Sequence, residues 1–233
     1  MDFLWEQFNI KTFPSRAVVF CDGEFRCDLS DESAATIKTE NDTIEIIAND
    51  GDEPVHIICV GELSGAKKII IKSCPTGGNS NIYFSLKAKN EKPAFLSIFV
   101  ENTGKNTEIH GDIVLQNYDN LRVEIVGDHL VADTGIFIKT RVLAHEKTTS
   151  ELIANANIVA GAPDCNNDIS FSVMAAPDAK IKMIPAQKLH SVPTSAEHAA
   201  AIYRGTDAQI EYLSAAGLSA EQISDILEEA FLN

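Results

Sequence analysis

From about Thr43 to Ile184 the chain is a succession of short runs in which apolar and polar residues alternate. The runs are rich in Val, Ile, Phe and Thr and are separated by clusters of Gly, Asn, Asp and Pro, a composition typical of β-strands joined by turns. Alternation within a run predicts a strand with one buried and one solvated face. Examples of expected strands are Thr43–Ala48, Val55–Val60, Lys68–Lys72, Asn81–Ala88, Phe95–Glu101, Ile109–Gln116, Leu121–Val126, Ile136–Val142, Leu152–Val159 and Ile169–Met174.

Two architectures are compatible with this spacing. Regular short strands occur in β-sandwiches and also in parallel β-solenoids, in which successive coils stack on one another. Apart from Asp22-Gly23, no tight Asn-Gly or Asp-Gly hairpin turn joins two well-matched strands. This scarcity favours the solenoid, but periodicity alone leaves both architectures open.

The pattern becomes helical near the C-terminus. Thr206 with Gln209, and Ser219 with Gln222, have the spacing of capping boxes, and Gly217 is placed to end the first of two helices. The apolar stripe of the second helix consists of Ile223, Ile226, Leu227, Ala230 and Phe231. From Asp207 onward there are six acids and neither Lys nor Arg. This helical hairpin is expected either to cap the last β-coils or to dock a partner protein.

Charge and cysteine usage restrict the partners and the compartment. The 233 residues contain 34 Asp and Glu against 19 Lys and Arg, a formal net charge of −15, so phosphate contacts with nucleic acid are not expected. No apolar run approaches the ~20 residues that a membrane helix needs, and the first twenty residues lack the pattern of a secretory signal. Five scattered cysteines, with no C-x-x-C pair, fit a reducing compartment. We therefore expect a cytoplasmic protein that binds neither nucleic acid nor membrane.

Common catalytic motifs are missing from the sequence. There is no G-x-x-x-x-G-K-[ST] phosphate loop, no G-x-S-x-G and no H-E-x-x-H. A parallel β-helix can host the carboxylate pair of a carbohydrate-active enzyme, but the sequence does not show which acids would pair. The residues alone therefore indicate no catalytic constellation, and we expect a protein without enzymatic turnover.

The C-terminal segment resembles the SufB/SufD family, the non-ATPase components of the SUF machinery for iron–sulfur cluster assembly. The resemblance lies in Ser195-Ala-Glu-His198-Ala-Ala200, Asp207-Ala-Gln-Ile-Glu-Tyr-Leu213, Ala216-Gly-Leu-Ser219 and Ala230-Phe-Leu232. Near the start, Arg16-Ala-Val-Val-Phe20-Cys-Asp-Gly23-Glu-Phe25 followed by Leu29-Ser30 is similar to a V-F-x-[ND]-G-x-F…L-S stretch of SufD-type proteins. Ala216-Gly217 stands where the family usually has Arg-Gly.

The resemblance implies a fold and partners. The fold is mainly β, a right-handed parallel β-helix (solenoid) with a small C-terminal α-helical domain. Two such subunits pair, so a homodimer, or a heterodimer with a SufB/SufD paralogue, is expected. A SufC-like ABC-type ATPase would dock on the C-terminal helices. The candidate partner-binding residues are Tyr212, Leu213, Ile226, Leu227 and Phe231.

His198 is the main candidate for iron chemistry implied by the resemblance. The family's histidine at this place lies at the subunit interface and is implicated in cluster assembly, and imidazole can bind iron beside thiolate. Glu197 matches the first Glu of a SufB-type Glu-His-Glu, whereas Ala199 replaces the second. The SufB-type cysteine would fall at Ser170, and the nearest thiol is Cys165. The candidate ligands of a transient iron–sulfur cluster are thus His198, Glu197 and Cys165.

The sequence divides into three expected parts: an N-terminal segment (1–40), the parallel β-helix core (41–190) and a C-terminal helical ATPase-docking domain (191–233). Together these features predict a non-ATPase scaffold subunit of a SUF-like complex. Two alternatives stay open. One is a structural or regulatory SufD-like subunit that binds the ATPase without handling iron, with His198 kept for the interface. The other is a β-helix enzyme that acts on polysaccharide.

Overall fold

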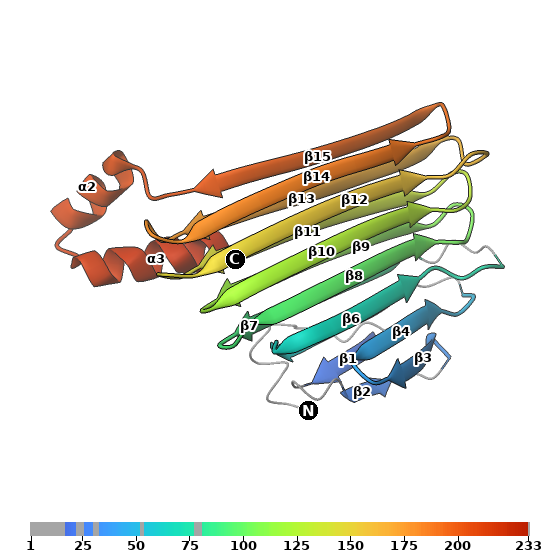
Figure 1. Ribbon diagram of the computed structural model, residues 1–233, viewed down its shortest axis with the longest axis horizontal. Helices are drawn as coiled ribbons and strands as arrows, with labels where there is room; N and C mark the ends of the chain where they lie inside the picture. Colours follow the sequence, from blue (N-terminus) through green and yellow to red (C-terminus); the bar gives the residue numbers. More distant parts are fainter. Residues whose placement is uncertain (1–16, 22–25, 30–32, 52–53, 77–80, 233) are drawn as a thin grey trace.

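A computed structural model describes residues 17–21, 26–29, 33–51, 54–76 and 81–232. They form a parallel β-solenoid of about five turns followed by two helices (Figure 1), so the mainly β solenoid prediction is confirmed and the sandwich is wrong. The strands are β1 (Ala17–Cys21), β2 (Arg26–Leu29), β3 (Ala35–Glu40), β4 (Thr43–Ala48), β5 (Val55–Glu62), β6 (Gly65–Lys72), β7 (Ile82–Asn90), β8 (Ala94–Asn102), β9 (Glu108–Asn117), β10 (Asn120–His129), β11 (Gly135–Ala144), β12 (Thr149–Ile158), β13 (Cys165–Ala175), β14 (Lys180–Leu189) and β15 (Thr194–Tyr203). The helices are α2 (Asp207–Ala215) and α3 (Ala220–Leu232).

Two sheets face each other across the core. The eight-stranded sheet has the order β15-β13-β11-β9-β7-β5-β1-β2, and the seven-stranded sheet has the order β14-β12-β10-β8-β6-β4-β3. From β4 onward the chain therefore alternates between the sheets, and each strand from β6 to β13 pairs in parallel with the strands two places before and after it. This connectivity explains why tight hairpin turns are scarce in the sequence, because parallel neighbours cannot be joined by a two-residue turn.

Apolar residues at alternate positions form the core in columns that run from coil to coil. One column of the seven-stranded sheet consists of Ile44, Ile69, Ile98, Ile125 and Ala154, which pair in register. All five are at most 1% exposed. β-branched side chains pack well at such half-buried positions of a pleated sheet, so strand propensity and burial agree within each coil.

The corners of the coils are closed by buried polar side chains. Asn102 is fully buried, and its Nδ2 donates to the carbonyl oxygens of Thr107 and Gly135 at 3.2 and 2.9 Å. His129 follows Asn102 in register one coil later and is also fully buried. The His129 ring nitrogens lie 2.8 Å from Thr134 Oγ1 and 3.3 Å from Asn167 Oδ1. Asn102 thus satisfies main-chain carbonyl groups at the turns, and His129 joins polar side chains of two neighbouring turns.

The two ends of the solenoid are built differently. At the N-terminal end, β2 pairs antiparallel with β1, and β3 pairs antiparallel with β4. The Asp22-Gly23 turn signal lies between β1 and β2, although residues 22–25 themselves are outside the described residues. At the C-terminal end, β14 and β15 are the outermost strands of their sheets, and each pairs on one side with a parallel neighbour.

Strand structure extends further in both directions than the expected core of 41–190. β1, β2 and β3 precede it, and β15 follows it inside the segment 191–233 that was expected to be helical. Alanine is the commonest residue of β15, and it gave no clear strand signal. The helical part begins only at Asp207, while residues 1–16 lie outside the described residues.

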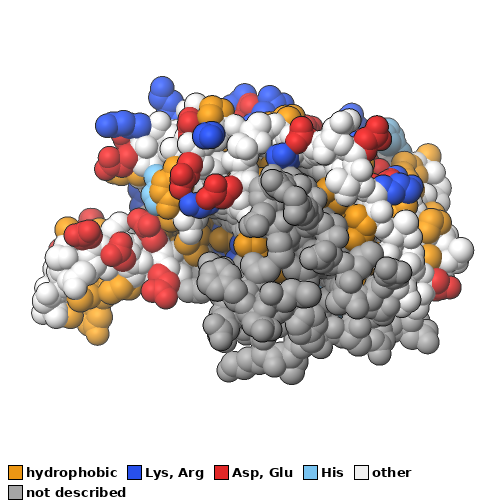
Figure 2. Space-filling view, turned by 90° about the horizontal axis from the view of Figure 1, so that it is seen from below, with side chains coloured by type: hydrophobic (Ala, Val, Ile, Leu, Met, Phe, Trp, Pro, Cys, Tyr) orange, Lys and Arg blue, Asp and Glu red, His pale blue; other side chains and the backbone are white. Residues whose placement is uncertain are grey.

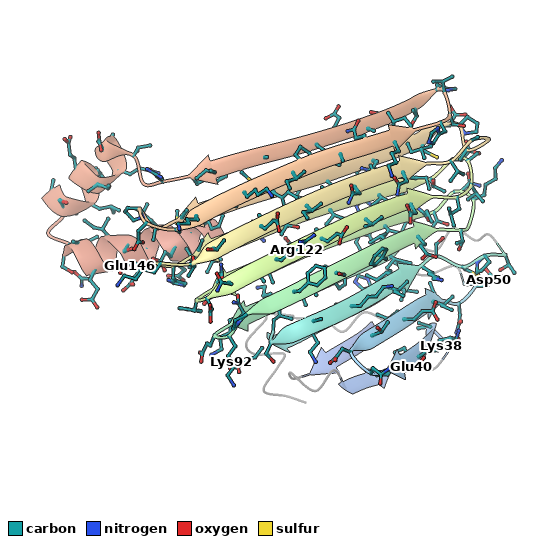
Figure 3. The ribbon with its side chains drawn as sticks, in the orientation of Figure 1. Lys38, Glu40, Asp50, Lys92, Arg122 and Glu146 are labelled. Atoms are coloured by element: carbon teal, nitrogen blue, oxygen red, sulfur yellow. The ribbon has the colours of Figure 1, made fainter. Side chains whose placement is uncertain are left out.

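Charged side chains cover the outer face of the seven-stranded sheet. Lys72 lies between Glu45 and Glu101 at 3.0 and 3.1 Å, and Arg122 pairs with Glu151 at 3.3 Å (Figure 3). Opposite charges on neighbouring strands attract one another, and solvent screens much of this attraction at exposed positions. This face is therefore solvated and charge-compensated.

His129 makes the stability of the fold depend on pH. Burial lowers the pKa of His129 from 6.5 to about 4, so acid protonates the unfolded chain first. Stability that is present above pH 6.5 should be lost progressively between about pH 6.5 and 4, by about 3 kcal/mol in total. Urea unfolding at several pH values measures this loss.

The variant His129→Asn keeps a polar side chain that already occupies the same column at Asn102, and it removes the titrating group. We expect its unfolding free energy to lose about 3 kcal/mol less than the wild type over the same pH range. His110→Asn, at a partly exposed ring, serves as the matched control. Equal pH slopes for wild type and His129→Asn would show that the ring is not held neutral.

Candidate functional site

The last coil exposes residues that would be core residues in any earlier coil. The inward positions are Ile181, Met183, Pro185, Gln187 and Leu189 on β14, and Thr194, Ala196, His198, Ala200 and Ile202 on β15. None of them is buried; Leu189 is 43% exposed and Ile202 is 52% exposed. The described residues leave this edge uncovered, as the upper rim of Figure 1 shows. An apolar end of this kind, with two long strand edges, is suited to an interface.

His198 lies at an inward position of β15. The equivalent positions on the preceding strands are occupied by Ile57, Phe84, Gly111, Ile138 and Ile169. Its Nδ1 is 3.1 Å from the carbonyl oxygen of Ile169, and its Nε2 is 3.1 Å from that of Ala186. Carbonyl oxygens only accept hydrogen bonds, and a neutral imidazole has one N–H to donate. The ring thus lies between β13 and β14 at the open end and, when neutral, donates to one of the two carbonyl oxygens, and each nitrogen faces a carbonyl oxygen.

Glu197 is separated from His198 by the pleat of the strand. It belongs to the outward column in which Phe137 and Asp168 precede it. Ala199, the position where a second glutamate would stand, is likewise outward and pairs with Ser170. Glu197 and His198 therefore point to opposite faces of the same sheet.

Cys165 is buried at the start of β13, at 2% exposure. Its thiol lies 3.3 Å from Thr134 Oγ1 and donates to the carbonyl oxygen of Ala162 at 3.2 Å. Cys165 pairs with Thr194, so His198 is four residues further along β15, about 13 Å at the usual rise of a strand. The thiol belongs to the buried polar corner with His129 and does not approach the imidazole of His198.

The structure therefore does not bring the three candidate ligands together within one chain. In the described part of the chain, no group of three or more His, Cys, Asp or Glu side chains is placed to hold a metal ion. A single copy does not fit an iron–sulfur cluster as a resident group, which requires several converging thiolate or imidazole ligands. Of the candidates, His198 alone occupies an inward position of the open last coil, where a second chain can add ligands.

The helical hairpin forms as the capping pattern predicts. Thr206 accepts from the backbone of Gln209, whose side chain accepts from the backbone N–H of Thr206, and Ser219 with Gln222 repeats this exchange. Gly217 has φ of +88°, a left-handed conformation that glycine adopts without strain and that ends the first helix. Both predicted helices are confirmed.

The apolar stripe of α3 is divided between a packed and an exposed side. Ile223 is the buried residue of the hairpin, and Phe231 contacts Tyr203 with ring centroids 5.7 Å apart. Leu213, Leu227 and Phe231 are half-buried. Ile226 is 40% exposed and Tyr212 is 75% exposed, so these two are the freest of the candidate partner-binding residues.

The hairpin lies beside the strand ends and does not cover the final edge of the solenoid. α3 packs beside β11, and the hairpin projects past the strand ends, at the left of Figure 1. Figure 2 shows acidic and hydrophobic side chains on this projection without basic ones between them. The apolar stripe thus packs on the strand ends of the later coils, with Phe231 against Tyr203 of β15, as expected. The helices lie at the side of the solenoid, however, and the described residues leave its final edge open.

A cavity of about 810 Å³ lies where the hairpin meets the solenoid. The solenoid contributes Tyr118, Leu143 and His145 to its lining, and α3 contributes Leu227 and Glu228. Figure 3 labels Glu146 at this junction. The rings of Tyr118 and His145 stack with centroids 3.9 Å apart and planes 12° apart. No local pattern in the sequence places Tyr118 and His145 together.

A second group of rings on the eight-stranded sheet was also missed. His56, Tyr83, His110 and Phe137 stack along the outer face, with successive centroids 5.1, 5.2 and 5.0 Å apart. They line a groove of about 530 Å³. The signal that could have found both groups is a repeat of 27 residues, from 56 to 83, 110 and 137 and likewise from 118 to 145.

Comparison of the sequence with family models and with curated proteins finds no match. Among the described helices, none has the length and apolar character needed to cross a membrane.

Proposed function

We propose that this chain is a non-ATPase scaffold subunit of a SUF-like iron–sulfur cluster assembly complex in the cytoplasm. The observation that carries the proposal is the open last coil, which places His198 at an apolar, strand-edged surface. The acidic hairpin supports a second contact, with the ATPase. The resemblance of the C-terminal motifs to the SufB/SufD family agrees with both features.

The open end supports pairing of two chains. β14 and β15 are ten residues long each and present unpaired strand edges, while the opposite end is finished by antiparallel strands. A second copy related by a two-fold axis offers the same two edges and the same exposed apolar residues, so the surface is self-complementary. A paralogue with the same open coil would fit in the same way.

The hairpin supports docking of a SufC-like ABC-type ATPase. Ile210, Tyr212 and Ile226 are exposed apolar side chains on two helices that carry six acids and no base. A partner that fits this surface has an apolar groove with basic residues at its rim. Since the sequence has no phosphate-binding loop of its own, ATP hydrolysis belongs to that partner.

Iron handling would take place where two last coils meet. The cluster is cargo in this proposal, and each chain contributes one imidazole rather than a complete ligand set. The ring of His198 binds iron only after it leaves a carbonyl oxygen of Ile169 or Ala186. Pairing of a second chain along β14 and β15 alters the strands that hold these carbonyls.

A second candidate function is a structural subunit that binds the ATPase and handles no iron. The specific observation in its favour is the separation of Glu197, His198 and Cys165 within one chain. In that case the ring of His198 has a structural role between the carbonyl oxygens of Ile169 on β13 and Ala186 on β14. The two candidates differ in the behaviour of His198 variants, and they share the same partners.

The hairpin surface can be tested with the cognate ATPase in co-expression and gel filtration. Ile226→Asp places a charge in the apolar contact, and we expect the complex to weaken at least tenfold. Leu130→Asp, at a similarly exposed apolar residue in a turn of the solenoid (43% against 40%), is the matched control and should bind normally. A complex unaffected by Ile226→Asp would show that the ATPase does not use this surface.

The open end predicts an oligomer that depends on β15. Ile202→Lys puts a charge on the exposed apolar edge, so we expect the dimer seen by sedimentation to dissociate to single chains, with unchanged circular dichroism. The same substitution at Leu130, outside the last coil, should leave the dimer intact. A wild-type protein that stays a single chain at high micromolar concentration would contradict the pairing.

The role of His198 separates the two candidate functions. The complex is prepared anaerobically with the ATPase, and its visible absorption is compared between wild type and His198→Ala. A visible band that disappears in the variant, while the complex remains, supports iron handling. A colourless wild-type complex, or a band unchanged by the substitution, assigns the chain to the structural role. Cys165→Ser is expected to leave the band unchanged, because the thiol is buried away from the open end.

A further inference from the structure

The junction between the hairpin and the solenoid contains an imidazole with an unusual environment. His145 follows β11, and its backbone N–H donates to the carbonyl oxygen of Asn117 at 3.0 Å. Its ring stacks on Tyr118 of the preceding coil, whereas Ala176 holds the equivalent position in the next coil. The small side chain of Ala176 leaves space on that side, and the cavity of about 810 Å³ extends there beneath α3.

The Nε2 atom of His145 is buried and has no hydrogen-bond partner among the described residues. Burial lowers the pKa of the ring, and the carboxylate of Glu228 on α3 opposes this shift. The other charged or titratable groups that line the cavity are Tyr118, Glu146 and Arg204. The Glu228 side chain accepts a hydrogen bond from Ser224 at 3.1 Å, and its carboxylate acts on the imidazole through charge rather than through a direct hydrogen bond.

α3 is the element that buries His145. Ser224, Leu227 and Glu228 line the same cavity as the ring, and α3 packs on the adjacent strand β11. The linker from β15 passes through Gly205, where an added Cβ would lie 2.7 Å from Leu227 Cδ1. Movement of the hairpin away from the strand ends would expose the ring to water on that side.

We propose that His145 is a proton-operated latch: the helical hairpin docks on the solenoid when His145 is neutral and is released when the ring is protonated. The physical basis is linkage, since a proton binds more strongly to the exposed ring than to the buried one. This latch is a property of the free chain. It goes beyond the proposed scaffold role and does not depend on the ATPase or on iron.

The sign and size of the effect follow from the two states of the ring. Burial holds the pKa of the docked ring below its ordinary value of 6.5, and undocking removes part of that burial, so docking favours the neutral form. The docking equilibrium is therefore constant above about pH 7 and falls as the pH drops through 6.5. Between pH 7.5 and 5.5 the loss is at most about tenfold, one factor of ten for each pH unit below the pKa of the undocked ring.

The latch is tested by NMR on the full chain, with the Leu227 methyl groups and the His145 ring followed between pH 8 and 5.5. We expect the Leu227 signals to shift along the titration of His145. His145→Phe keeps a ring on Tyr118 and removes both the proton and the unpaired nitrogen, so the Leu227 signals should become independent of pH. His110→Phe replaces another stacked histidine, far from the hairpin, and should retain the pH response.

Glu228→Gln gives a test in the opposite direction. Removing the carboxylate takes away the charge that favours protonation in the docked state, so the loss of docking in acid should be larger than in the wild type. The proposal is overturned if the Leu227 signals respond to pH equally in wild type and His145→Phe, or if His145 titrates at its ordinary value while the hairpin is docked. A smaller acid response in Glu228→Gln would also overturn it.

Discussion

Parallel pairing of successive coils in register is the constraint on which the rest of the structure depends. Each inward residue packs against the residue one coil before and one coil after it, so Ile98 needs Ile69 and Ile125 as neighbours. The side chains of a column stay buried only where another coil follows. The same rule that makes the middle of the solenoid stable leaves its last coil without a partner, and the exposure of Leu189 and Ile202 follows directly from it.

At the beginning of the solenoid, each sheet ends in a short antiparallel strand, β2 of four residues and β3 of six residues. Antiparallel pairing of β2 with β1 and of β3 with β4 turns each sheet back on itself. No comparable element follows β14 and β15 among the described residues, and the hairpin that could have served is placed beside β11. His198 interrupts an apolar column at this open edge. A polar side chain in a core column costs folding free energy unless it is hydrogen-bonded. A histidine at the open end of such a column therefore points to a role at that surface.

The sequence predicts the fold well because burial alternates with a period of two. Strands such as Thr43–Ala48 match the structure to the residue, and the capping boxes at Thr206 and Ser219 locate both helices. The alternation says nothing about which strands pair, so it leaves sandwich and solenoid open. β15 is missed because its four alanines are not apolar enough to produce a visible alternation with its polar residues. The grouping of Tyr118 with His145 depends on the 27-residue coil length, which links positions that local patterns treat as unrelated.

The attachment of the hairpin is weak enough for a single proton to matter. Ile223 is the one fully buried residue that the described part of α2 and α3 contributes, and full burial of such a side chain stabilises by about 1.5–3 kcal/mol. A tenfold change in docking corresponds to about 1.4 kcal/mol, which is a large share of that contact. The solenoid is held by whole columns of buried isoleucine, so a change of this size is a small share of its contacts. Regulation by charge is therefore expected at the junction of the hairpin rather than within the coils, and the position of α3 relative to β11 is the structural variable through which it acts.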